Sequence, residues 1–115
     1  MERLCVRIDA IPREHQRYAT EGDWLVHGDS IDIYVSGDSE DQQFLYAVHE
    51  LIEAYLCKKR GITTEQVDAF DMAFKGEGEP GDSPAAPYRN EHRFAMLIEH
   101  LVARELGLAG YGRVE

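Results

Sequence analysis

The chain has 115 residues, the length of a single domain, which excludes two-domain enzymes and the large barrel and doubly wound folds. Hydrophobic residues make up 43% of the sequence, enough for one compact core, whereas 22 acidic residues against 12 basic ones leave a formal net charge of −10. This charge argues against direct binding to nucleic acid or to an anionic membrane. The acidic residues therefore either keep the chain soluble or converge in part on a cation.

The cysteine content and the N-terminal sequence indicate a cytoplasmic protein. Cys5 and Cys57 are far apart and form no C-x-x-C motif, and the sequence leaves open whether they pair. The first residues lack the apolar core of a signal peptide, and no apolar run approaches the length of a membrane span.

Residues 1–36 show the alternation of a small β-sheet. Apolar positions alternate with polar ones over residues 3–8, and residues 24–35 have the pattern of a hairpin. Asp32 falls on the polar face of the strand from Ile31 to Val35. We therefore expect this strand at an exposed edge of an antiparallel sheet.

The rest of the chain predicts three helices. Ser39 and Thr63 each begin a capping-box pattern, and Gly61 and Gly107 are typical helix stops. The predicted elements are a long helix over residues 39–61, a short helix over 63–73, a Gly- and Pro-rich loop over 75–87 and a last helix over 88–107. Strands grouped before helices predict an α+β domain over residues 1–115, with about three antiparallel strands packed against two long helices and one short helix.

Both long helices carry an apolar stripe that predicts the core-facing side. On the first long helix the stripe comprises Phe44, Leu45, Val48, Leu51, Ile52, Tyr55 and Leu56. On the last helix it comprises Phe94, Leu97, Ile98, Leu101 and Val102.

Residues 49–53 of the first long helix have the sequence H-E-x-x-E. His49 and Glu53 lie one helical turn apart and could hold one metal ion, while Glu50 is offset around the helix and could deprotonate a metal-bound water. Glutamate is an oxygen ligand for Zn²⁺ and makes the site harder, so Mn²⁺ and Fe²⁺ are alternatives. The same residues also fit a partly buried histidine that is hydrogen-bonded to Glu53 or to a backbone carbonyl.

The last helix carries a matching set of polar residues. His92 and Glu99 share one side of this helix with only alanines between them, so this side could face the first long helix and supply His92 as a third ligand. Glu91 and Glu99 are alternative ligands or outer partners. Asp71, on the short helix, could orient a metal-bound histidine or could simply be solvated.

Beyond this motif, the sequence resembles a family of small phage and prophage proteins with zincin-like character. The matching stretches are GDW at 22–24, LYAVHELIEAYLCKKRGIT at 45–63, VDAFD at 67–71, EPGDSPAAPYRNEH at 79–92 and AMLIEHLVARELG at 95–107. The resemblance implies a zincin-like core in the host-cell cytoplasm, with His49, Glu53 and His92 as zinc ligands and Glu50 as general base. It also implies a peptide substrate along the strand from Ile31 to Val35.

Three functions are compatible with these patterns. The first is a zinc-dependent, peptidase-like hydrolase in which Tyr88 or Arg89 helps to stabilise the oxyanion. The second resembles the all-α NTP pyrophosphatases, because E-x-x-E at 50–53 and E-x-x-D at 65–68 match their Mg²⁺-binding letters. The third is a non-enzymatic acidic protein that binds a basic host surface and carries a metal only as a structural support.

Overall fold

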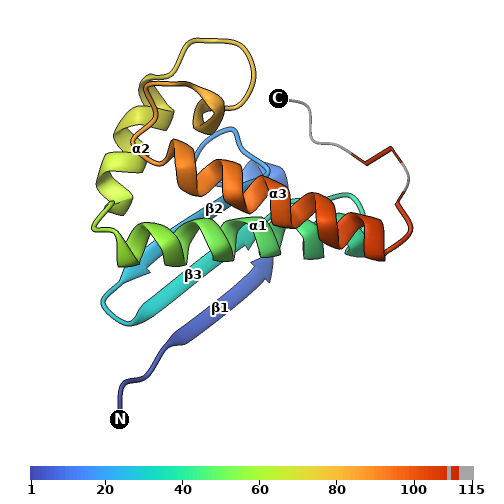
Figure 1. The fold of residues 1–115 in the computed structure, drawn as a ribbon, viewed down its shortest axis with the longest axis horizontal. Coiled ribbons are helices and arrows are strands. Elements are labelled where there is room, and N and C mark those ends of the chain that lie inside the picture. The colour runs from blue at the N-terminus through green and yellow to red at the C-terminus, as the bar shows by residue number, and fades with distance from the viewer. Residues whose placement is uncertain (109, 112–115) are drawn as a thin grey trace.

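The computed structural model describes residues 1–108, 110 and 111, and it has the α+β architecture that the sequence predicts (Figure 1). The strands are β1 (Cys5–Ala10), β2 (Gly22–His27) and β3 (Ser30–Val35). The helices are α1 (Glu40–Lys59), α2 (Thr64–Ala73) and α3 (Arg89–Glu105), with short 3₁₀ turns at Arg13–His15 and Pro80–Asp82.

Local sequence sets the ends of α1 and α2 as predicted. The Ser39 side chain accepts a hydrogen bond from the Gln42 backbone N–H, and Thr63 and Gln66 form a complete capping box. α1 stops before Gly61, whose φ of 73° is readily adopted only by glycine.

The sheet is mixed, so the prediction of an antiparallel sheet is wrong in one pairing. β2 and β3 form the predicted antiparallel hairpin, but β1 pairs with β3 in parallel, and the strand order is β1-β3-β2. The segment after β1 carries the chain across to the far edge, and the hairpin then returns β3 to the middle. Asp32 therefore marks the face of the sheet away from the helices, and the strand from Ile31 to Val35 is central rather than an edge.

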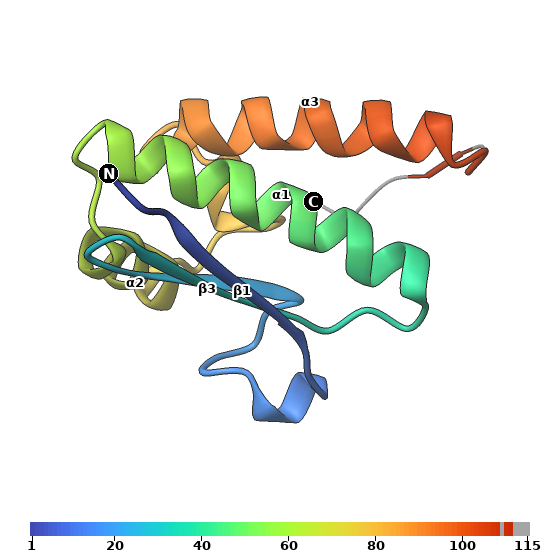
Figure 2. The same cartoon turned by 90° about the horizontal axis from the view of Figure 1, so that it is seen from below.

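The elements form three successive levels, with the sheet at one side, α1 across it and α3 against α1 (Figure 2). The apolar core lies between β2, β3 and α1. Its most buried members are Trp24, Ile31, Ile33, Val35, Ala54 and Cys57. Cys5 and Cys57 are both free thiols.

α1 and α3 do not pack through their predicted apolar stripes, and that prediction is corrected by the structure. Leu97 is 55% exposed, whereas Ala95 and Glu99 on the opposite side of α3 are 0% exposed. On α1, Leu45 is buried as expected, but Phe44 is 52% exposed. The small and polar faces meet because alanines allow the helices to approach closely and because the buried histidines and glutamates pair with one another.

This inverted packing predicts opposite responses to two substitutions on α3. Ala95→Leu should lower the free energy of unfolding by about 1–3 kcal/mol, because a larger side chain overpacks the contact between α1 and α3. Leu97→Lys should change it by only about 0.5 kcal/mol or less, because Leu97 is largely exposed. Urea denaturation of both variants measures the difference, and the reverse ranking would contradict the observed packing.

No helix in the described part of the chain combines the length and apolarity that crossing a bilayer requires.

Candidate metal centre

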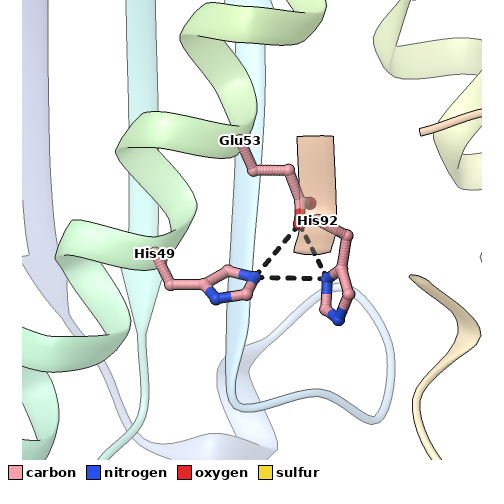
Figure 3. Close-up of side chains that lie close together, drawn as sticks. All are labelled: His49, Glu53 and His92. Carbon is pink, nitrogen blue, oxygen red and sulfur yellow. Dashed lines mark hydrogen bonds and ion pairs between the residues drawn. The ribbon is translucent and has the colours of Figure 1, made fainter. Parts of the chain in front are cut away.

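The three predicted ligands lie together between α1 and α3 (Figure 3). His49 and Glu53 project side by side from α1, and His92 approaches them from α3. The distances are 3.1 Å from His49 Nε2 to Glu53 Oε2, 2.9 Å from Glu53 Oε2 to His92 Nδ1 and 3.3 Å between the two histidine nitrogens. Each of the three residues is at most 4% exposed.

This triangle has the dimensions of three corners of a zinc tetrahedron. With zinc–ligand distances of about 2.0–2.2 Å, tetrahedral geometry places neighbouring ligand atoms about 3.3–3.6 Å apart. The observed separations of 2.9, 3.1 and 3.3 Å require only small movements to reach these values. A fourth corner would remain for water or substrate, as in catalytic zinc sites.

Each of the three residues is also held through its other polar atom. His49 Nδ1 lies 2.9 Å from Glu99 Oε1, and Trp24 Nε1 donates a hydrogen bond of 3.0 Å to Glu53 Oε1. His92 Nε2 lies 3.1 Å from a carboxylate oxygen of Glu79 and 3.3 Å from one of Asp82. Outer carboxylates of this kind orient metal-bound histidines and fix which ring nitrogen faces the metal.

The predicted role of Glu99 as an outer partner therefore fits its position. Glu99 is fully buried, and its other carboxylate oxygen accepts a hydrogen bond from the Tyr111 hydroxyl.

Buried charges in this cluster compensate one another. Burial lowers the pKa of His49, but Glu53 and Glu99 outweigh it and raise this pKa to about 9. Burial likewise lowers the pKa of His92, but Glu53 and Glu79 raise it to about 11. Burial raises the pKa of Glu53, yet His49 and His92 outweigh it and hold it below its usual range. Protons on the histidines thus supply the positive charge that a bound metal ion could supply instead.

Glu50 lies beside the three candidate ligands. Its carboxylate oxygen is 4.0 Å from His49 Nε2, and it lines a pocket of about 120 Å³ together with the three candidate ligands. Gly22 allows this approach, because a Cβ atom there would come within 2.8 Å of the Glu50 carboxyl group. The pocket is smaller than the roughly 300 Å³ at the lower end of ligand sites, so it admits a small reacting group rather than a whole ligand.

A second glycine packs against the histidine that α3 contributes. A Cβ atom at Gly81, in the turn Pro80–Asp82, would lie 2.5 Å from the His92 ring. This contact brings Glu79 and Asp82 within reach of His92, so the loop over residues 75–87 completes the site.

Two of the proposed alternative residues are engaged elsewhere. Asp71 accepts hydrogen bonds from the hydroxyl groups of Tyr18 and Tyr88 rather than from a histidine. It still lines the pocket, and burial raises its pKa to about 6, although both tyrosine hydrogen bonds act in the opposite direction. Glu91 pairs with Arg60 at 2.7 Å, so it is not one of the candidate ligands.

The acidic pattern of the NTP pyrophosphatases is not assembled. Glu50 lines the pocket, but neither Glu65 nor Asp68 does. Glu65 is exposed, and Asp68 is held by the guanidinium group of Arg17 at 2.9 Å. The sequence match to that class therefore has no spatial counterpart.

The sequence did not reveal the roles of Trp24, Glu79, Gly81 and Asp82. Trp24 was predicted only as a strand residue, and the other three fell within a loop whose composition gives no contact information. Their stretches, GDW at 22–24 and EPGD at 79–82, lie in the segments that carry the family resemblance, and this was the one available signal.

No protein-family model matches the chain, and no curated protein or solved structure is significantly similar to it. The class of site is therefore defined by its own geometry, which is that of a buried mixed histidine and carboxylate centre next to a small pocket.

Proposed function

We propose that this protein binds a zinc ion through His49, Glu53 and His92 and uses it in a hydrolytic reaction. The observation that carries the proposal is the triangle of ligand atoms, 2.9–3.3 Å apart, in which every residue is also held through its second polar atom. Mn²⁺ and Fe²⁺ are the alternatives that a site with one carboxylate ligand allows.

Zinc bound at this position would activate water, and the chain would supply the proton acceptor. Glu50 is buried beside the candidate ligands and outside the triangle, so its carboxylate can take a proton from a water in the pocket. The Tyr88 hydroxyl donates its single proton to Asp71 at the pocket wall, so it would stabilise developing negative charge on a substrate carbonyl by turning this hydrogen bond from Asp71 to the substrate. The role of Glu50 is the one that the zincin resemblance implies for this helix.

An acyl substrate would approach along β2, which is the edge strand beside the site. The Val26 N–H bonds to the Thr64 hydroxyl, and Gly22 exchanges hydrogen bonds with the Thr20 hydroxyl. By strand alternation, the backbone N–H and C=O groups of Trp24 also point away from β3. They lie between Gly22 and Val26, whose outward groups already have hydrogen-bond partners. This arrangement favours pairing with one residue of a substrate over a long added strand.

Elemental analysis of the protein purified without chelator tests the metal proposal. We expect about one zinc ion per chain, with an anomalous scattering peak between the three ligands in a crystal. Protein that contains no stoichiometric metal, and that takes up none on addition of zinc, manganese or iron(II), would refute the proposal.

The raised histidine pKa values predict that metal affinity increases with pH. At pH 7 the metal-free cluster holds at least one proton, since the pKa values of His49 and His92 are raised to about 9 and about 11. A metal ion must displace this proton, so the apparent affinity should rise at least about 10-fold per pH unit from pH 6 to pH 8. Competition with a chromophoric chelator at each pH measures it, and a pH-independent affinity would show that the histidines are not ligands.

A further inference from the structure

We propose that a second copy of this chain pairs with the free edge of β1 and forms a two-fold symmetric dimer with a continuous six-stranded sheet. This inference is independent of the metal centre, which lies toward β2 at the opposite edge of the sheet.

β1 has an uncovered apolar face. Val6 and Ile8 are in register with Ile31 and Ile33 of β3, so they point to the same side of the sheet as those buried residues. They are nevertheless 40% and 46% exposed, because α1 crosses β2 and β3 and leaves β1 open (Figure 2).

An apolar groove runs between this face of β1 and the outer side of α1. The residues that line it are Leu4, Val6, Leu51, Ile52, Tyr55 and Leu56. Four large side chains of the groove and of β1 are more than a third exposed, namely Leu4, Val6, Ile8 and Tyr55. Together they present apolar surface on the order of 350 Å². This area is nearly half of the roughly 800 Å² that each partner buries in a standard interface. The backbone edge of β1 and the side of α1 that borders the groove would add to the buried area.

The backbone of β1 is also available for pairing. The N–H groups of Cys5 and Ile11 bond to carbonyls of the β3 side at 3.0 and 2.8 Å, so odd-numbered residues face β3. By alternation, Leu4, Val6 and Ile8 direct their N–H and C=O groups to the free edge. The same three residues thus supply the edge hydrogen bonds and the side chains of the uncovered face.

Apolar pairing and charge together favour one antiparallel register. With Val6 on the two-fold axis, Leu4 lies opposite Ile8 of the other copy, and Arg3 lies opposite Asp9. Centring the pair on Arg7 would place two arginines opposite each other. Centring it on Ile8 would pair Arg7 with Asp9 but would place Leu4 opposite Pro12, which lies beyond the end of β1. In the register centred on Val6 the two β1 strands lie side by side, so the two grooves join into one apolar surface with α1 of each copy along one side of it.

Sedimentation equilibrium or light scattering at 1–100 μM tests the dimer. The wild-type chain should have twice the 13.1 kDa mass of one chain. Val6→Pro removes an outward N–H without disturbing the bonds to β3 and should give a monomer. The control Leu97→Lys changes an exposed apolar residue on α3 and should leave the dimer intact. Circular dichroism confirms that each variant is folded, and Val6→Lys repeats the test if Val6→Pro is not.

Disulfide cross-linking tests the register. In a Cys5→Ser background, Val6→Cys should form a disulfide-linked dimer under oxidation, whereas Arg7→Cys should not. A wild-type chain that is monomeric at 100 μM, a dimer that only Leu97→Lys dissociates, or cross-linking at position 7 alone would overturn the proposal.

Discussion

Replacement of His49 by alanine should weaken zinc binding by more than about 100-fold, beyond the roughly 10–100-fold effect of losing an outer partner. His49 supplies one corner of the ligand triangle and is 1% exposed, so no other side chain or bulk water can easily take its place. Isothermal titration with Zn²⁺ measures the loss. Glu99→Gln, which removes the charge beside His49 Nδ1, should show the smaller effect.

The same substitution should remove the response of thermal stability to metal. A ligand present at 100 times its Kd stabilises the folded state by about 2.7 kcal/mol, which corresponds to a shift in Tm of about 10 °C for a domain of this size. We therefore expect EDTA to lower the Tm of the wild-type protein by about 10 °C and to leave that of His49→Ala unchanged.

His27→Ala is the matched control for these measurements. His27 is exposed at the end of β2, outside the pocket, so its loss should alter neither the affinity nor the response to EDTA. If His49→Ala binds zinc as tightly as His27→Ala does, the metal lies elsewhere.

Glu50→Gln should separate catalysis from metal binding. The substitution preserves the size of the side chain but removes the carboxylate that accepts a proton, so turnover should fall by about 100- to 10,000-fold with zinc content unchanged. Glu50 is outside the ligand triangle, which is why the metal should be retained.

Two substrates measure this turnover, each with and without EDTA. One is a mixture-based peptide library whose cleavage is analysed by mass spectrometry, and the other is an activated ester. Glu77→Gln, in the exposed part of the loop before the site, is the control for loss of one negative charge. If the zinc-loaded wild type cleaves neither substrate class, the hydrolase proposal fails and the metal is structural. If Glu50→Gln keeps full activity, Glu50 is not the base.

The zinc-binding and turnover measurements together distinguish the hydrolase from a non-enzymatic acidic binding protein. A structural metal would give the His49→Ala effects on affinity and Tm but no zinc-dependent cleavage. In that case, charge reversal of exposed carboxylates, rather than Glu50→Gln, should weaken capture of a basic partner.

Local sequence accounts for the helices and strands and for much of the site. Capping at Ser39 and Thr63, the stop at Gly61 and the alternation of the hairpin fixed helix and strand positions to within a few residues, because these signals act over a single turn. The i, i+4 spacing of His49 and Glu53 likewise placed two side chains together without tertiary information.

How the elements face one another depends on tertiary packing. An apolar stripe predicts burial when one helix packs on one core, but α3 packs on α1 through Ala95 and Glu99 and leaves Leu97 exposed. Strand order depends on the path of the connections between strands, and these connections place β3 between β1 and β2. The contacts of Glu79 and Asp82 with His92 depend on the path of a loop, which spacing along the chain does not encode.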